Sequence, residues 1–343
     1  MSRPIRQSGI GTNEQRRTEK SGHNTKTEHA MQGHIVITGA TGVIGAAVAA
    51  ALIREGYDVV ILARSTQAAA EKIPGAANYL AWDADKADGE WVASIEGAKA
   101  VIHLAGKPLL ESRWTEEHKK ACYDSRINGT RHMVAAIAGA KKKPEIFLSA
   151  SAIGYYGSFE SCGDTPEITE NGAEGRDFLA RICIDWEKEA DPAKMPGVRV
   201  VLLRTGIVLT TQGGMLQKMM TPFNFFLGGP IGSGNQCISW IHIDDEIQAI
   251  RELLLNPAYQ GAVNLVGPKP VSMKEFAVEL GSVMQRPSLF AVPKLAVQLL
   301  LGEGAEYAVK GQRVIPAKLV ENGFVFSSPR LFDALMELVS GKK

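Results

Sequence analysis

The sequence is poor in cysteine, and its cysteines lie far apart. The 343-residue chain has four, at Cys122, Cys162, Cys183 and Cys237, and no two of them form a C-x-x-C pair. This spacing argues against a zinc site and against a disulfide framework, and it fits a reducing cytoplasm. We therefore expect a cytoplasmic protein without a bound metal.

Long apolar runs are also absent, and neither sign of charge is in excess. The longest candidate run, Leu295 to Leu301, is far shorter than the roughly 20 residues of a membrane-spanning helix. The 38 basic side chains almost balance the 37 acidic ones, which gives no reason to expect nucleic acid or an anionic membrane as a partner. We expect a small-molecule substrate, neither nucleic acid nor membrane as partner, and a homodimer as a possible assembly.

Residues 1–31 have no hydrophobic periodicity. They are polar, with many Gly, Ser, Thr, Asn and Arg residues, which is typical of disorder. The stretch lacks the apolar core of a secretory signal, and Glu14, Glu19 and Glu28 argue against a transit peptide. We expect a disordered extension over residues 1–31 and leave it out of the fold prediction.

The stretch from His34 to Gly45 organises the rest of the chain. A short apolar strand breaks into three glycines with the spacing G-x-x-G-x-x-G, and a helix follows to about Glu55. The first glycine permits a tight turn, the second lets the backbone approach a pyrophosphate, and the third lets helix and strand pack closely. The helix would direct its free N–H groups and positive dipole end at the phosphates. The residues expected to hold a dinucleotide here are Gly39, Thr41, Gly42, Val43, Ile44 and Gly45. An ordinary tight turn is the alternative.

The end of the second expected strand indicates which dinucleotide is bound. An acidic residue there would hold the ribose 2′-hydroxyl of NAD, but this strand ends in Arg64 and Ser65. A guanidinium and a hydroxyl suit a 2′-phosphate instead. We therefore expect NADP(H) rather than NAD(H), with a solvated Arg64 at the strand end as the alternative.

The next two expected strands add further candidate cofactor contacts. Asp83 follows the third strand and either accepts a hydrogen bond from the adenine amino group or caps the next turn. Leu104, Ala105 and Gly106 follow the fourth strand, where small residues would let the cofactor lie across the strand ends. His103 lies in an apolar run, so we expect a satisfied core histidine there rather than a catalyst.

Two polar features follow in the second half of this region. Asn128 and Gly129 interrupt a long helical segment, and because both are poor helix formers they indicate a bend or a functional side chain. Ser151 and Tyr156 follow the fifth strand, and polar groups at the carboxyl end of a central strand face the ligand crevice of an open α/β sheet.

Strands and helices alternate along the chain to about residue 265, with the glycine loop on the first unit. This order predicts an α/β fold with a doubly wound, mostly parallel Rossmann-type sheet. From residue 272 onward the pattern is mostly short helices, which we expect to cover the cofactor cleft and shape its specificity.

These motifs together resemble the extended short-chain dehydrogenase/reductase superfamily, the group of NAD-dependent epimerases and dehydratases, over about residues 33–267. The shared strings are GATGVIG at 39–45, HLAG at 103–106, Asn128-Gly-Thr, and Arg204-Thr-Gly. An epimerase-like subfamily with an appended C-terminal domain is matched more narrowly, through RWTEEHK at 113–119, SAIGYYG at 151–157, GGPIGSGNQ at 228–236, NLVGP at 264–268 and GQRVIPAKLVENGFVF at 311–326. The resemblance implies a nicotinamide cofactor, an NAD(P)-binding domain over 32–286 and a short helical domain of unknown function over 287–343.

The sequence departs from the superfamily at its catalytic dyad. Members use Tyr-x-x-x-Lys on the helix after the fifth strand, where the tyrosine is the acid/base and the lysine lowers its pKa. None of the seven tyrosines here has Lys four residues later, and the best alignment puts Leu179 and Cys183 in the two places. Ser151 and Asn128 match the superfamily's serine and asparagine.

Two hypotheses follow from the missing dyad. In the first, the protein is an NADP(H)-dependent oxidoreductase with a replacement acid/base. Tyr156 is the preferred candidate, with Tyr155, Cys183 and His242 behind it, although a phenol with a pKa near 10 needs a neighbour to lower it and Tyr156 could serve only to position the substrate. In the second, the protein is a non-catalytic dinucleotide-binding sensor or assembly protein.

Overall fold

The computed structural model describes residues 33–109 and 112–341, and the chain from Gly33 onward forms one compact unit. The extension expected over 1–31 lies outside the described residues. In the part of the chain that the structure describes, no helix is both long and apolar enough to cross a membrane.

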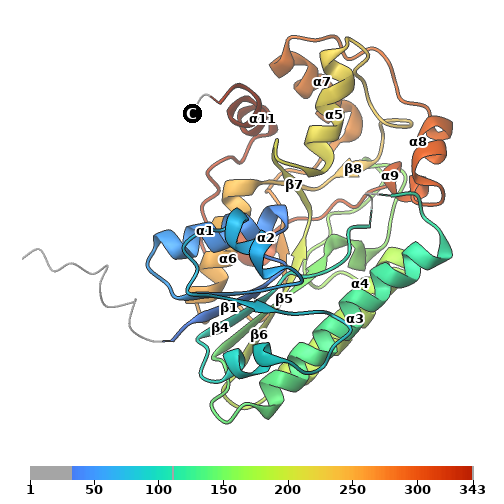
Figure 1. The fold of residues 1–343 in the computed structure, drawn as a ribbon. Coiled ribbons are helices and arrows are strands. Elements are labelled where there is room, and N and C mark those ends of the chain that lie inside the picture. Colours follow the sequence, from blue (N-terminus) through green and yellow to red (C-terminus); the bar gives the residue numbers. More distant parts are fainter. Residues whose placement is uncertain (1–32, 110–111, 342–343) are drawn as a thin grey trace, which may run out of the picture. The chain divides into compact units, whose positions relative to one another are not determined.

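A seven-stranded sheet with the order β10-β6-β5-β4-β1-β2-β3 forms the centre of the fold (Figure 1). All neighbouring strands pair in parallel. The chain runs outward from β1 in both directions, which confirms the predicted doubly wound sheet and places the topological switch point beside β1. The strands are β1 (Ile35–Thr38), β2 (Val59–Ala63), β3 (Asn78–Ala81), β4 (Ala100–His103), β5 (Ile146–Ala152), β6 (Arg199–Thr205) and β10 (Gly261–Leu265).

Helices cover both faces of this sheet (Figure 1). Alternate strand residues point to opposite faces, so Ile35 and Ile37 pack with the helices of one face and Val36 with those of the other. Because both faces are covered, the inner strands are mostly apolar and buried on both faces, and polar residues such as Thr38 and His103 stand near their carboxyl ends. The first face carries α1 (Val43–Arg54), α2 (Thr66–Lys72) and α6 (Ile243–Leu255), and the second carries α3 (Glu116–Gly139) and α4 (Phe178–Ala190).

Helix α3 runs without interruption through Asn128 and Gly129, so the bend suggested by these residues is absent. The reason for the glycine is packing. A Cβ at Gly129 would lie 3.3 Å from the Trp82 ring and 3.3 Å from the Ala84 Cβ. The helix therefore accepts a poor helix former because the chain that follows β3 lies against it.

The C-terminal region is mostly helical, as expected, but its last helix shares a hydrophobic core with residues before 287. Leu331 and Leu335 pack with Phe223, Trp240 and Phe276 in one cluster.

The remaining elements are η2 (Glu90–Ile95), η3 (Ile153–Tyr156), η4 (Asp191–Ala193), β7 (Ile207–Leu209), α5 (Gly214–Asn224), β8 (Cys237–Ile238), β9 (Trp240–His242), β11 (Val271–Ser272), α7 (Met273–Met284), α8 (Lys294–Leu301), α9 (Ala305–Ala308), α10 (Ala317–Glu321) and α11 (Leu331–Ser340).

One prediction from the cysteine spacing was wrong. Cys162 and Cys237 form a disulfide across 75 residues of sequence, whereas Cys122 and Cys183 are free and buried. The pairing depends on a tertiary contact, because the Cys162 N–H donates to the Asn235 carbonyl at 2.7 Å and holds the two segments together. The spacing of cysteines in the sequence cannot predict such a contact. The disulfide also removes the reason that we gave for a reducing compartment.

The disulfide predicts a definite thiol count. Protein denatured without reductant is expected to react with about two equivalents of a thiol reagent, and with four after reduction. Cys162→Ser should raise the first value to three, because it releases Cys237. Four reactive thiols before reduction would contradict the pairing.

Candidate functional site

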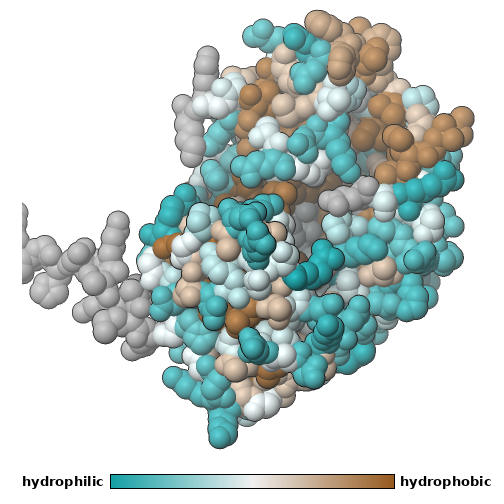
Figure 2. Space-filling model, in the orientation of Figure 1, coloured by the Kyte–Doolittle hydropathy of each residue, from teal (hydrophilic) through white to brown (hydrophobic). Residues whose placement is uncertain are grey.

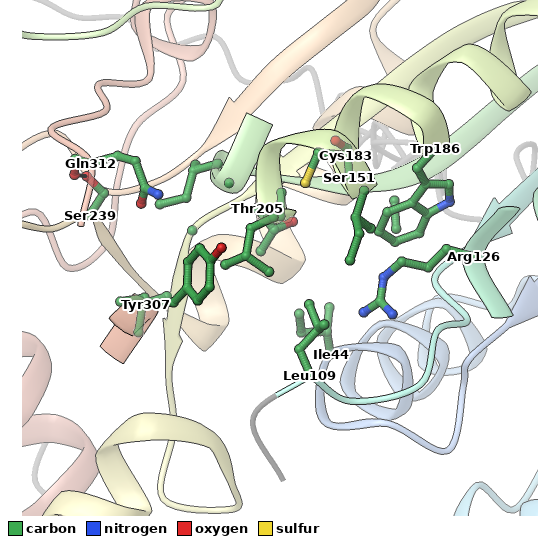
Figure 3. A pocket seen from close by; sticks show the side chains of 18 of the residues that line it. Ile44, Leu109, Arg126, Ser151, Cys183, Trp186, Thr205, Ser239, Tyr307 and Gln312 are labelled. Atoms are coloured by element: carbon green, nitrogen blue, oxygen red, sulfur yellow. Dashed lines mark hydrogen bonds between the residues drawn. The ribbon is translucent and has the colours of Figure 1, made fainter. Parts of the chain in front are cut away.

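A pocket of about 510 Å³ lies at the carboxyl ends of the central strands. The glycine loop and the start of α1 form one wall, and residues at the ends of β5 and β6 form another. Helices α3 and α4 contribute Arg126 and Trp186, while the C-terminal region contributes Tyr307 and Gln312 (Figure 3). This is the crevice in which open α/β sheets bind their ligands.

The glycine loop has the geometry that its spacing predicted. Gly39 has φ of 70°, and a Cβ there would lie 2.6 Å from the backbone carbon of Leu104. A Cβ at Gly45 would overlap the carbonyl oxygen of Gly39. Gly42 begins α1 without a hydrogen-bonding side-chain cap among the described residues, and no acidic residue occupies the first turn. The first N–H groups of α1 therefore border the pocket and are available to an anion.

The cofactor residues expected from the sequence divide into two groups. Those that line the pocket are Gly39, Gly42, Val43, Ile44, Gly45 and Leu104. Thr41, Ala105 and Gly106 do not line it, but they lie within two residues of Gly42 or Leu104 in sequence. The Thr41 carbonyl accepts from Lys72 Nζ at 2.7 Å, and the Ala105 N–H donates to Thr38 Oγ1 at 3.3 Å. Both hydrogen bonds hold the loop in place and do not extend into the pocket.

Arg64, Ser65 and Asp83 lie outside the pocket, where β2 and β3 end. Arg64 is exposed. Ser65 is the N-cap of α2, because its Oγ accepts from the Ala68 N–H at 3.3 Å. Asp83 Oδ1 accepts from the Asp85 N–H at 3.1 Å, which is the turn-capping arrangement that we considered for it.

Asn128 points away from the pocket, and Arg126 takes the place expected for it. Asn128 Nδ2 donates to Asp85 Oδ1 at 3.2 Å. Side chains two positions apart on an α-helix, such as those of Arg126 and Asn128, point in directions that differ by about 200°. Arg126 therefore projects into the pocket (Figure 3). Its Nη1 donates to the carbonyls of Lys107 and Cys122 at 2.8 and 2.9 Å. The sequence prediction missed this cation because it did not follow the helix phase.

Tyr156 is a core residue in the structure. Its side chain is buried, its hydroxyl donates to Asn264 Oδ1 at 2.7 Å, and it accepts from Arg204 Nη1 at 2.9 Å. Burial, as the main cause, raises the pKa of this phenol. The acid/base role that we expected for Tyr156 does not suit this position, because the hydroxyl is enclosed by protein and is not part of the pocket wall.

Ser151 lines the pocket, but its hydroxyl is held by a buried ion pair. Its Oγ donates to Glu187 Oε1 at 2.6 Å. The same carboxylate accepts from Nε and Nη2 of Arg204, both at 2.8 Å. Serine, carboxylate and guanidinium thus form one network that continues to Tyr156, which fixes the carboxyl end of β5 against α4.

The two positions aligned with the missing dyad do face the pocket. Leu179 and Cys183 both line it from α4. Leucine has no ionisable group. The pKa of the Cys183 thiol is raised to about 12, mainly by burial and next by the nearby charge of Glu187. The thiol is neutral at pH 7, so neither position supplies a proton-transfer group at that pH.

His103 is a core histidine, as expected, but it is only half satisfied, because its Nε2 is buried and has no hydrogen-bond partner among the described residues. It is fully buried on β4, and its Nδ1 lies 2.8 Å from Thr38 Oγ1 on β1. Burial lowers its pKa to about 4, so the imidazole is neutral at pH 7.

Two further pocket residues were missed by the sequence prediction. Glu246 on α6 is fully buried, and burial raises its pKa to about 8. In sequence it follows Asp244 and Asp245 and reads as part of an acidic helix start; only its helical phase with Ile250 and Leu253 indicates an inward direction. Tyr307 comes from the C-terminal region and directs its ring into the pocket (Figure 3).

Comparison with known proteins agrees with this architecture. Residues 35–266 match the model of the NAD dependent epimerase/dehydratase family, and residues 292–338 match DUF1731, a domain of unknown function. The chain is 40% identical over 315 residues to "Epimerase family protein SDR39U1 homolog, chloroplastic" from Arabidopsis thaliana, covering 91% of this chain and 88% of that protein. It is 36% identical over 311 residues to "Epimerase family protein YfhF" from Bacillus subtilis, covering 90% and 99%.

Among solved structures, the crystal structure of human epimerase family protein SDR39U1 (isoform 2) with NADPH is similar, with a TM-score of 0.79 and 30% identity over 90% of this chain and 100% of that chain. The sheet order, the glycine loop and these matches lead to one conclusion. The chain belongs to the NAD dependent epimerase/dehydratase family and carries the DUF1731 domain at its C-terminal end.

Proposed function

We propose that this protein binds NADP(H) in the pocket and is an oxidoreductase that exchanges hydride with a carbonyl or alcohol group of a small-molecule substrate. The observation that carries the proposal is the glycine loop. It offers the uncapped start of α1 to one end of a pocket whose other end lies at β5 and β6. The NADPH named with the human relative supports the choice of cofactor.

The residues present fit such a cofactor. Gly42 has no Cβ in front of the first N–H groups of α1, which leaves room for a pyrophosphate. Arg64 and Ser65 would hold the 2′-phosphate where β2 ends, and Asp83 the adenine. Leu104, Ala105, Gly106 and Asn128 remain proposed contacts along its length, with Asn128 the weakest because it points to Asp85. When bound, the cofactor supplies the hydride acceptor or donor.

The proton-transfer group of this proposal is Tyr307. It is a pocket tyrosine, and its hydroxyl accepts from the Phe178 N–H at 3.3 Å. Burial is the main cause that raises its pKa, and the charges of Asp177 and Glu306 raise it further, whereas the Phe178 hydrogen bond and the charge of Lys310, another pocket residue, lower it. A cation near a phenol is part of the superfamily dyad, but here Lys310 is paired with Glu306 and has the weakest of these influences.

A non-catalytic dinucleotide sensor is the second candidate function. The observation in its favour is that Leu179 and Cys183 occupy the dyad positions and supply no acid/base at neutral pH. NADPH binding without turnover of carbonyl and nucleotide-sugar substrates, and without any effect of Tyr307→Phe, would favour the sensor over the enzyme.

Cofactor binding can be tested by titration with NADPH and NADH, followed by nicotinamide fluorescence. Gly42→Val is expected to weaken NADPH binding at least about 100-fold by filling the phosphate position. Arg64→Glu is expected to weaken NADPH binding about 10- to 100-fold and to leave NADH binding unchanged, because only NADPH carries the 2′-phosphate.

Arg54→Glu is the matched control for Arg64→Glu. It makes the same change of charge at the last residue of α1, a 12-residue helix about 18 Å long. We expect it to leave both affinities unchanged. A wild-type protein that binds neither dinucleotide would contradict the proposed cofactor, and equal effects of the two charge reversals would contradict the role of Arg64.

Assembly and location also remain proposals. A homodimer is supported by the exposed leucines of α8, Leu295, Leu299 and Leu300, which lie in an apolar part of the surface (Figure 2). A cytoplasmic location no longer has the cysteine pattern in its favour, since Cys162 and Cys237 are paired.

A further inference from the structure

One buried acidic group in the pocket wall has no role in the function proposed above. Glu246 lies in the first turn of α6 with 0% of its surface exposed, and it is one of the residues that line the pocket. It packs on the same face of the sheet as α1, beside the carboxyl end of β6. A carboxyl group is rarely buried so completely without a partner for both of its oxygens.

Only one of the two carboxyl oxygens has a partner. The Thr205 hydroxyl donates to Oε1 at 3.1 Å. Oε2 is fully buried and makes no hydrogen bond within the described part of the chain. An unsatisfied buried polar group lowers the stability of the folded protein. A buried oxygen of this kind in a pocket wall indicates a polar ligand group that reaches it.

The surroundings keep this carboxyl group protonated at neutral pH. Burial raises its pKa to about 8, opposed only by the Thr205 hydrogen bond. The other ionisable groups on the pocket wall are Arg126, Cys183, Tyr307 and Lys310, and those at the start of α6 are His242, Asp244 and Asp245. None of these charges contributes to the shift. Oε2 is then an O–H donor and Oε1 is an acceptor.

A protonated carboxyl group is complementary to a primary amide. Each presents one donor and one acceptor side by side, so the two groups can form a pair of hydrogen bonds. The nicotinamide ring carries such an amide. In this fold the ribose on the adenine side lies where β2 ends, so the nicotinamide half extends over β4, β5 and β6. Thr205 is the last residue of β6, and Glu246 is its partner.

Building on the proposed NADP(H) site, we propose that Glu246 holds the carboxamide of the nicotinamide ring. Oε2 donates to the amide oxygen, Oε1 accepts from the amide N–H, and the Thr205 hydroxyl fixes the orientation of the carboxyl group. Glu246 is thereby assigned as a residue that positions the reactive ring over the end of β6, next to the side chains that enclose the substrate.

The test compares two ligands, NADPH and 2′-phospho-ADP-ribose, which lacks the nicotinamide. Dissociation constants are measured by calorimetry between about pH 7 and pH 9.5, above the phosphate pKa of about 6, for wild type, Glu246→Gln and Glu246→Leu. Glutamine keeps one donor and one acceptor but does not ionise, so it is the matched control. Circular dichroism confirms that the variants are folded.

We expect the wild-type dissociation constant for NADPH to rise about tenfold across this pH range, as Oε2 loses its proton. Glu246→Gln should bind NADPH as tightly as wild type at pH 7 and show no such rise. Glu246→Leu should bind NADPH about tenfold more weakly at pH 7. Binding of 2′-phospho-ADP-ribose should be the same in all three proteins.

Two results would overturn the assignment while leaving the cofactor site intact. One is an identical pH profile for wild type and Glu246→Gln. The other is an equal loss of affinity for both ligands in Glu246→Leu, which would mean that Glu246 only supports the fold of the pocket. A wild-type protein that binds neither ligand would overturn the proposed cofactor function, and this assignment with it.

Discussion

Replacing Arg204 with methionine is expected to lower the free energy of unfolding by about 3–5 kcal/mol. The guanidinium forms a buried ion pair with Glu187, and the side chains of the two residues are only 6% and 9% exposed. Without Arg204 the Glu187 carboxylate keeps the Ser151 hydroxyl as its remaining partner, and a buried charge is left uncompensated. The Tyr156 hydroxyl also loses a donor. Urea denaturation at pH 7 measures the change.

Arg313→Met is the control for this prediction. Arg313 pairs with Glu167 at 3.0 Å, but the two side chains are 36% and 51% exposed, so solvent screens the interaction. Its loss should cost at most about 1 kcal/mol. The double variant Arg204→Met/Glu187→Met should be more stable than Arg204→Met alone, because it removes both buried charges. Similar costs for Arg204→Met and Arg313→Met would refute the central role of the buried pair.

A single methyl group at Gly39 is expected to destabilise the protein by about 2–5 kcal/mol. Two effects add in Gly39→Ala. The residue has φ of 70°, where an L side chain is strained, and its Cβ would lie 2.6 Å from the carbon and 2.7 Å from the oxygen of Leu104. These are backbone atoms directly after β4, so the clash is relieved only if β1 and β4 move apart. Thermal and chemical denaturation measure the loss.

Gly42→Ala is the comparison for Gly39→Ala, because Gly42 is proposed to leave room for the pyrophosphate and has no strained backbone angle. Gly42 has φ of −74°, which suits any residue, and a Cβ there would meet only the Gly39 carbonyl oxygen, at 3.2 Å. We expect a stability change below about 1 kcal/mol. If Gly39→Ala and Gly42→Ala proved equally destabilising, the difference that we assign to the two glycines would be incorrect.

The sheet could be predicted from the sequence because local patterns determine it. Most of its strands are short apolar runs that alternate with helical segments, and right-handed crossovers leave few ways to order such units. The ends of β2 and α1, at Ala63 and Arg54, differ from the expectation by about one residue. The helices after residue 272 were also expected, but their shared core with α5 and β9 was not, because no local pattern encodes it.

The sequence predicted the part of the site that backbone geometry defines. It did not predict the part that depends on the direction of side chains. The glycine loop requires positive φ and close approach, and both leave glycine in the sequence. Arg126 and Glu246 lie on helices among other charged residues, and only their helical phase distinguishes them. Tyr156 follows Ser151 beyond the carboxyl end of β5, which predicts a side chain in the crevice, but the turn of η3 directs it into the core. The disulfide joins segments that only the folded chain brings together.

The pocket draws its walls from two parts of the chain that can change independently. The cofactor end is made by the glycine loop, where a Cβ at Gly39 or Gly45 would collide with backbone atoms. The opposite wall includes Tyr307, Gly311 and Gln312 from the C-terminal region. A substitution at Gln312 would alter the shape of the cavity without touching the loop. If the proposed function holds, a change of ligand could therefore arise in the C-terminal segment while the dinucleotide site stays the same.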